Sequence, residues 1–255
     1  MGVPSLGCHC RVCESSDPRD NRTRPSVLVS RDGHHVVIDT SPDFRFQALR
    51  EKLDRLDAIV YTHAHADHIL GFDDIRPYNM RQKTALPVYA TAETLAILRR
   101  TFSYVFDGAP VLSTIPEVTT HLIDGPFELL GTEWVPVPAQ HGEMHVMGFR
   151  VGGMAYLTDF SRVPAESKRL LEDLDDLVLD ALRDEPHPMH MTVAQALALV
   201  SELKPRRAWF THIAHDLPHR ETNERLSREG FPQVQLAYDG LRFDIHIETH
   251  ATVRA

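Results

Sequence analysis

The chain has 255 residues, a length that fits one domain or two. Apolar residues make up 42% and charged residues 25% of it, which excludes a disordered or collagen-like protein. The 27 Lys and Arg against 36 Asp and Glu give a net charge of −9, which disfavours a long nucleic acid as partner. Residues 1–13 lack the apolar core of a signal peptide, and no apolar run is long enough to span a membrane. We therefore expect a cytoplasmic protein that acts on a small molecule.

Apolar and β-branched runs alternate along the chain with stretches of helical periodicity. We expect, in chain order, strands 26–30 and 35–39, helix 44–53, strands 58–62 and 86–90, helix 93–100, strands 132–136, 144–151 and 154–158, helix 165–174, strand 177–179, helix 193–204, strand 207–211 and helix 222–229. Pro and Gly are spread along the chain, so no linker divides it. The pattern predicts a single α/β domain over residues 1–255.

Three of the predicted strands end in Thr followed directly by a potential metal ligand. These ligands are His63, Asp159 and His212. Loops at strand ends are where α/β proteins usually place their chemistry, because the strands hold the loop anchors rigidly. We therefore expect one site at an edge of the sheet.

Residues 62–68 read Thr-His-Ala-His-Ala-Asp-His and place four strong ligands close together. In an extended segment His63 and His65 point the same way, while Asp67 and His68 follow as the chain turns toward a helix. A lone histidine is usually an ordinary polar residue, but three histidines and an aspartate in this spacing after a strand indicate a metal site. The segment offers ligands to two adjacent cations.

The three cysteines are Cys8, Cys10 and Cys13. Cysteines this close in sequence make poor disulfides, so the spacing favours a soft metal such as zinc, with unliganded thiols as the alternative. Three thiolates leave a tetrahedral zinc one ligand short. A fourth ligand must come from elsewhere in the chain.

The motif His-x-His-x-Asp-His over residues 63–68, followed by single His141, Asp159 and His212, resembles the metallo-β-lactamase fold superfamily. The resemblance implies a four-layer αββα sandwich with the metal site at one edge of the sheets. It implies two catalytic cations, zinc or manganese, whose ligands are His63, His65 and His141 for the first, Asp67, His68 and His212 for the second, and Asp159 for both. Asp39 matches an acidic residue behind the metal loop that is expected to orient ligands.

A narrower resemblance covers nearly the whole chain. It points to the branch of phosphoribosyl 1,2-cyclic phosphate phosphodiesterases of bacterial phosphonate (carbon–phosphorus lyase) metabolism, and rests on residues 2–10, 24–26, 39–45, 71–76 and 211–216. This branch implies a structural zinc (segment 7–13) held by Cys8, Cys10, Cys13 and His215. It also implies that His190 is an acid–base group, with His187 as the rival residue.

We expect, from these residues and this resemblance, a metal-dependent phosphodiesterase that hydrolyses a phosphoribosyl 1,2-cyclic phosphate or a related sugar or nucleotide cyclic phosphate. Asp67 would position the attacking hydroxide and His190 would protonate the departing sugar oxygen. The alternatives within the same fold are a thioesterase or lactonase and a relative tied to quinone-cofactor biosynthesis. The oligomeric state stays open, a homodimer being one option.

Three arginines are candidates for contacting a substrate phosphate, namely Arg45, Arg76 and Arg81. Arg76 lies close to Asp73 and fits a structural ion pair at least as well. Aromatic residues alternate over 102–106, which suits either a strand-like flap or core packing. The relatives that the chain resembles usually carry a strand ahead of the segment that matches residues 2–4. Either this strand is absent here or the start of the chain was assigned late, and we expect one sheet edge to lack a partner strand.

Overall fold

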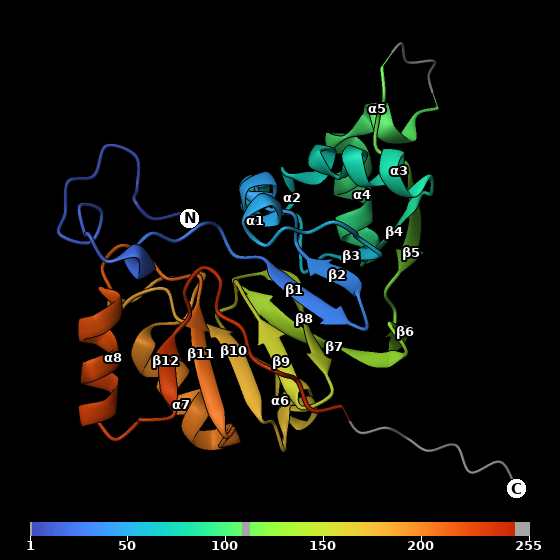
Figure 1. Ribbon diagram of the computed structural model, residues 1–255. Coiled ribbons are helices and arrows are strands. Elements are labelled where there is room, and N and C mark those ends of the chain that lie inside the picture. The colour runs from blue at the N-terminus through green and yellow to red at the C-terminus, as the bar shows by residue number, and fades with distance from the viewer. Residues whose placement is uncertain (1, 109–112, 248–255) are drawn as a thin grey trace, which may run out of the picture.

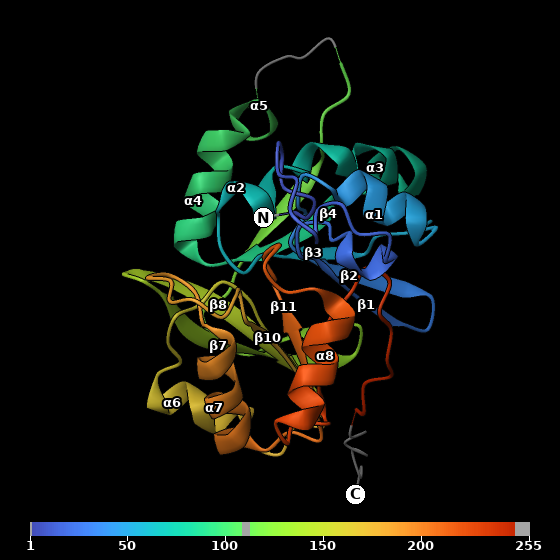
Figure 2. The same ribbon diagram turned by 90° about the vertical axis from the view of Figure 1, so that its left-hand side faces the viewer.

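The computed structural model describes residues 2–108 and 113–247. Its strands form two stacked sheets, and helices cover the outer face of each sheet (Figures 1 and 2). The first sheet has five strands in the order β1-β2-β3-β4-β5, and the second has seven in the order β12-β11-β10-β9-β8-β7-β6. The predicted αββα sandwich is therefore confirmed.

The strands of the first sheet are β1 (Val27–Arg31), β2 (His34–Ile38), β3 (Ala58–Val60), β4 (Leu86–Ala90) and β5 (Val118–Leu122). Those of the second sheet are β6 (Phe127–Leu129), β7 (Thr132–His141), β8 (Met144–Val151), β9 (Met154–Leu157), β10 (Asp176–Asp180), β11 (Arg207–Thr211) and β12 (Val234–Leu236). Strands β2 to β5 are parallel, as are β9 to β12. The carboxyl ends of parallel strands meet at one edge, so the loops that follow them gather there.

Helices on the outer side of the first sheet are α1 (Phe44–Arg50), α2 (Ala66–Ile69), α3 (Arg76–Gln82), α4 (Ala92–Thr101) and α5 (Ser103–Phe106). The second sheet is covered by α6 (Ala165–Lys168), α7 (Val193–Leu203) and α8 (His219–Arg228). Short 3-10 turns occupy η1 (Pro18–Asp20), η2 (Phe72–Ile75) and η3 (Arg169–Leu171). No helix in the described ranges combines the length and the apolar character needed to cross a membrane.

Three apolar layers separate the four layers of backbone. In β2 the side chains alternate, so that Val36 and Ile38 pack between the sheets while Val37 packs beneath the helices. Trp134 is fully buried between the sheets. Because both faces of the central strands are covered, these strands read in the sequence as nearly continuous apolar runs.

The predicted elements are present, with shifted ends. Helix α7 begins at the capping box of Thr192 and Gln195 and ends where Lys204 turns left-handed before Pro205. The helix expected over 165–174 is interrupted, since α6 is followed by the 3-10 turn η3. The sequence reading missed β5, β6, β12, α3 and α5.

The strand-like flap expected over residues 102–106 is wrong. Residue 102 follows α4 directly, and 103–106 form the short helix α5. Phe102 and Phe106 pack beside Phe72 in the apolar layer beneath the helices. Core packing of the aromatic rings therefore explains the alternation.

Strand β1 is an edge strand of the first sheet. A cavity of about 1090 Å³ lies along it, lined among others by Val29, Trp134, Tyr156 and Phe243. The segment that includes Phe243 runs along the inner face of the second sheet, where its ring stacks on Trp209. The open edge of the first sheet is thus bordered by apolar side chains.

Candidate active site

Three polar residues that follow strands have a strained, left-handed backbone conformation. Asp39, Asp159 and His212 adopt positive φ values of 62°, 51° and 55°. Side chains other than Gly rarely occupy this left-handed region, and when they do so the surrounding structure holds them there. The backbone at each of these strand ends turns sharply, which aims the three side chains at one region between the sheet edges.

The loop after β3 supplies four more of the predicted ligands. His63 is buried and His65 is the residue that precedes the first turn of α2, with Asp67 and His68 inside that turn. The rings of His63 and His68 lie 4.2 Å apart between centroids, and those of His63 and His65 lie 4.7 Å apart. The predicted turn into a helix at Asp67 is therefore present.

Asp159 lies at the centre of this group. Its Oδ2 lies 3.8 Å from His63 Nε2 and 3.4 Å from His212 Nε2, and its Oδ1 lies 3.3 Å from His68 Nε2. His212 Nε2 is 3.6 Å from the Asp67 carboxylate. The structure thus brings one carboxylate into reach of histidines from both predicted ligand sets.

His141 comes from the end of β7 and completes the group, with its ring 5.1 Å from the His65 ring. We call the whole set the cation cluster; its members are His63, His65, Asp67, His68, His141, Asp159 and His212. Within it, the ligand atoms of His63, His65 and Asp159 lie within 4.8 Å of one another, and so do those of Asp67, His68 and His212. The structure therefore places every predicted ligand of the two catalytic cations at one site.

Two buried imidazole nitrogens of the cluster are suited to binding divalent cations. His63 Nε2 and His68 Nε2 are buried, and no residue in the described ranges forms a hydrogen bond with either. A buried nitrogen without a partner is costly, and both of these face the Asp159 carboxylate. Imidazole and carboxylate are ligands of zinc and manganese. The two nitrogens therefore have a natural role as cation ligands.

Electrostatics within the cluster are strongly coupled. Burial opposes ionisation of Asp159, but the charges of His212 and His68 hold its pKa well below the ordinary value. Burial and the neighbouring His68 push the pKa of His63 well below its ordinary value. The neutral imidazole of His63 and the ionised carboxylate of Asp159 are the forms that bind a metal ion. Burial opposes protonation of His68, but Asp159 and Asp39 outweigh it and hold the pKa of His68 well above its ordinary value, so a cation bound there would displace a proton.

Hydrogen bonds behind the cluster fix the orientation of its rings. His141 Nδ1–H donates to the Met189 carbonyl at 2.7 Å, which leaves Nε2 to face the cluster. Asp39 accepts from His68 Nδ1 at 2.7 Å, as the resemblance led us to expect of this carboxylate. Each of these rings is thus held by an anchor outside the cluster.

His190 lies against the cluster from the loop between β10 and α7. Its ring stacks on His212 at 4.7 Å and 11°, and meets the edge of His141 at 4.7 Å. Its Nδ1–H donates to Asp180 Oδ2 at 2.7 Å, so Nε2 is the nitrogen left for substrate. The rival, His187, lies farther out, with its ring 5.0 Å from that of His190.

Asp180 is a site residue that the sequence reading missed. It is fully buried at the end of β10, and burial raises its pKa well above the ordinary value. Besides its hydrogen bond with His190, Asp180 accepts a hydrogen bond from the backbone N–H of Phe160, the residue that follows Asp159. Strand 177–179 followed by an acidic residue repeats the strand-end pattern, and this signal could have revealed Asp180.

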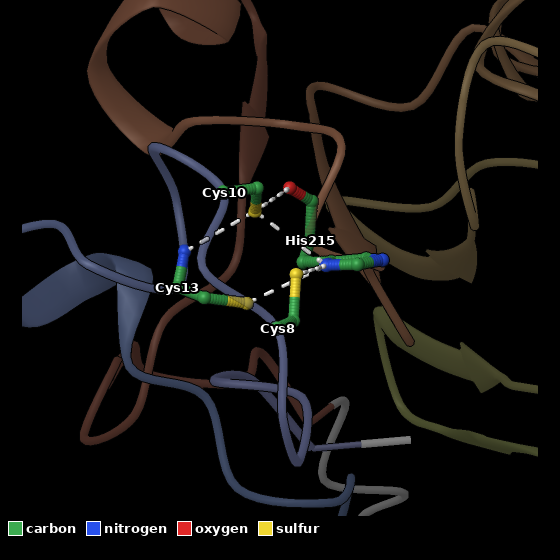
Figure 3. A group of neighbouring side chains, drawn as sticks. All are labelled: Cys8, Cys10, Cys13 and His215. Atoms are coloured by element: carbon green, nitrogen blue, oxygen red, sulfur yellow. Dashed lines mark hydrogen bonds between the residues drawn. The ribbon is translucent and has the colours of Figure 1, made fainter.

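The three cysteines converge on His215, as Figure 3 shows. His215 Nδ1 lies 3.2 Å from Cys8 Sγ, 3.6 Å from Cys10 Sγ and 3.4 Å from Cys13 Sγ. A single ring nitrogen cannot bond three sulfurs at once, whereas tetrahedral zinc sets its sulfur and nitrogen ligands about 3.6 Å apart. We call this group the cysteine–histidine site. His215 lies where the fourth ligand of a zinc ion would be needed, and these four residues could together hold one.

The three arginines do not reach the cation cluster through any described contact. Arg76 pairs with Asp73 at 2.7 Å and donates to the Thr114 carbonyl, which bears out the structural ion pair. Arg81 lies 3.7 Å from the Asp54 carboxylate, and Arg45 is exposed on α1. None of them therefore has a contact that supports a phosphate-binding role.

Comparison with known proteins places the chain in a family. The model of the β-lactamase superfamily domain matches residues 34–213. A solved structure of a diphosphatase from the PhnP family is 48% identical and superimposes with a TM-score of 0.87, over 94% of this chain and 91% of that one. The zinc-bound PqqB of Methylobacterium extorquens is 23% identical, with a TM-score of 0.72 over 96% of each chain, and shares the fold.

A curated relative, an octanoyltransferase of Porphyromonas gingivalis, is 38% identical over 248 residues. The match covers 94% of this chain but 48% of that protein, so the chain spans about half of the length of this relative. Its activity therefore cannot be carried over from the match. The chain belongs to the metallo-β-lactamase fold superfamily, in the branch that contains the PhnP family.

Proposed function

We propose that the protein is a metal-dependent phosphodiesterase that hydrolyses a small cyclic phosphodiester, most simply a phosphoribosyl 1,2-cyclic phosphate or a related sugar or nucleotide cyclic phosphate. The observation that carries the proposal is the Asp159 carboxylate between His63, His68 and His212, with His190 beside it. The similarity to a diphosphatase supports hydrolysis at phosphorus.

The cation cluster would hold two divalent cations. His63, His65 and His141 would bind one, Asp67, His68 and His212 the other, and Asp159 both. Such cations lower the pKa of water and neutralise negative charge on phosphoryl oxygens. The chain contributes the fixed geometry, since buried rings anchored by Asp39 and Met189 need little reorganisation when a substrate binds.

His190 would act as the general acid. Its Nδ1 is held by Asp180, so a proton on Nε2 can pass to the sugar oxygen as the bond from that oxygen to phosphorus breaks. Asp67, the most exposed of the acidic ligands, would help to position the attacking oxygen on the opposite side of phosphorus. Asp180 would act on the reaction only through His190, as a positioning residue.

The cysteine–histidine site would hold a structural zinc. None of the three cysteines forms a disulfide, and closely spaced cysteines of this kind are typical of zinc sites in reducing compartments such as the cytoplasm. The net charge of −9 agrees with a small substrate and disfavours a long nucleic acid.

A substrate panel tests the proposal. Zinc- and manganese-loaded protein is assayed on ribosyl 1,2-cyclic phosphate, on nucleoside 2′,3′- and 3′,5′-cyclic phosphates, on a thioester and on a lactone. The proposal predicts the highest kcat/KM on one of the cyclic phosphates. A preference for the thioester or lactone would instead support the other hydrolases of this fold.

A further inference from the structure

One loop carries residues of both predicted metal centres. It connects β11 to α8 and contains His212 of the cation cluster and, three residues later, His215 of the cysteine–histidine site. His212 adopts a left-handed backbone conformation at the start of this loop. A displacement of the loop would therefore move His212 as well as His215.

The N-terminal segment holds this loop at a second place, through Arg22. The Arg22 guanidinium donates to the Ala214 carbonyl at 3.0 Å and to the Leu217 carbonyl at 2.6 Å. These two carbonyls lie on either side of His215. The planar, forked guanidinium suits such a double contact, because its N–H donors are fixed in direction, whereas those of a lysine ammonium are not.

The guanidinium is itself held rigidly. Asp20 accepts from Arg22 Nη2 at 3.0 Å, and both side chains are about 6% exposed. The same Asp20 oxygen accepts the backbone N–H of His219 at 2.8 Å, at the start of α8. The backbone of Arg22 is paired with Val3 in both directions, at 2.8 and 2.7 Å. Val3 and Arg22 thereby close the loop of chain that contains the three cysteines.

The opposite side of the loop rests on the backbone that leads to His190. Ala214 N–H donates to the Leu182 carbonyl at 2.9 Å, two residues after Asp180. The loop is therefore bonded to Arg22 and the cysteines on one side and to the segment that carries His190 on the other. From the N-terminal side the loop is held by the two contacts of Arg22 to its carbonyls and by the contacts of the three cysteines to His215.

We infer that Arg22 is a positioning residue for His212, and that metal binding at the cysteine–histidine site and at the cation site containing His212 are thermodynamically coupled through this loop. Zinc at the first site fixes His215, Arg22 fixes the carbonyls on either side of it, and His212 is held in place for the second site. The inference rests on the proposed cation sites and not on the identity of the substrate.

Manganese binding measures the coupling without an activity assay. Metal-free protein with all three cysteines is first given one equivalent of zinc, which thiolates bind in preference to manganese, whereas the variants that lack Cys13 are used without zinc, so that zinc does not enter the cation cluster. Mn²⁺ is then titrated in, and the unbound ion is followed by electron paramagnetic resonance. Four variants are compared with the parent: Arg22→Met, Cys13→Ser, the double variant of these two, and the control Arg24→Met, which breaks a nearby ion pair with Asp43 that does not touch the loop.

We expect Arg22→Met to weaken one of the two Mn²⁺ binding steps by on the order of tenfold and to leave the other within about twofold. Cys13→Ser should weaken the same step. The double variant should lose less than the product of the two single losses, because both act through one loop. Arg24→Met should bind Mn²⁺ as the parent does.

An Mn²⁺ isotherm for Arg22→Met that matches the parent, or equal weakening of both steps, would overturn the inference and leave Arg22 a general stabiliser of the fold. If Arg22→Met does not fold, Arg22→Lys takes its place with the same expectation, since Lys keeps the charge but not the fork. Coupled Mn²⁺ binding in a protein without phosphodiesterase activity would contradict the proposed function and not this inference.

Discussion

Asp39 and His68 form a fully buried pair, with His68 Nδ1 2.7 Å from Asp39 Oδ2. The Asp39 carboxylate also accepts from Thr62 N–H at 2.8 Å and from Thr62 Oγ1 at 2.7 Å. Because that hydroxyl donates to Asp39, it accepts from His63 Nδ1 at 3.0 Å. One carboxylate therefore fixes the tautomers of two rings and leaves both Nε2 atoms for cations.

Replacing Asp39 with Asn should lower the affinity of the cation cluster by about 10- to 100-fold, because an amide cannot accept from every donor that the carboxylate serves. Metal content after dialysis against a graded chelator measures this loss. Asp57→Asn is the matched control, since Asp57 also accepts from a histidine ring and a backbone N–H but lies away from the cluster. Equal metal retention in both variants would contradict the role given to Asp39.

Elemental analysis of the protein should approach three metal equivalents per chain, two at the cation cluster and one at the cysteine–histidine site. Cys10→Ser should remove the most tightly held zinc and lower the thermal midpoint, because structural zinc binding contributes directly to folding free energy. The other two equivalents should remain detectable, with one of them held more weakly. Unchanged zinc content in Cys10→Ser would rule out the structural site.

His190→Ala should leave both catalytic cations bound and slow turnover by about 10²- to 10⁴-fold on a diester with a poor leaving group. A nitrophenolate leaving group needs little protonation, so the loss on that substrate should be much smaller. His187→Ala is the control, since its ring lies farther from the cluster. Equal losses on both substrates, or the loss of a metal equivalent, would remove His190 from the acid role.

His219 predicts a dependence of stability on pH. Burial, together with the charges of Arg19 and Arg22, lowers its pKa to about 4, while its Nε2 accepts from Asn223 at 3.1 Å. In the unfolded chain the pKa is about 6.5, so the unfolded state binds the proton first and stability falls as the pH drops from 6.5 toward 4. The effect is at most about 3 kcal/mol.

The control for His219 is a variant that cannot titrate. His219→Gln should lose part of the change in unfolding free energy between pH 6.5 and pH 4, as measured by urea denaturation at several pH values. Above pH 6.5 the two proteins should differ by a constant amount. Parallel curves across the whole range would show that His219 carries no such effect.

Much of the fold and of the cluster could be predicted because the signals are local. Buried parallel strands read as short apolar runs, and the ligands of residues 63–68 are adjacent in the sequence. The strand-end pattern located Asp159 and His212 as well. The capping box at Thr192 and the following Pro205 fixed the limits of α7 almost to the residue.

The rest depends on contacts that are distant in the sequence. Strands β6 and β12 have only three residues each, too few to show a period, and their pairing supplies the strand conformation. Arg22 and His219 carry no motif, and their roles arise from burial against the loop after β11. Asp180 could have been found, but its importance depends on a ring ten residues away in the sequence.

The substrate comparison on metal-loaded protein tests the central claim most directly. Turnover of a ribosyl 1,2-cyclic phosphate is measured beside a thioester with the same preparation, and Asp159→Ala serves as the inactive control because its carboxylate faces His63 of one ligand set and His68 and His212 of the other. The account predicts a kcat/KM on the cyclic phosphate far above that on the thioester, abolished in Asp159→Ala. A thioester preferred over every cyclic phosphate would contradict it.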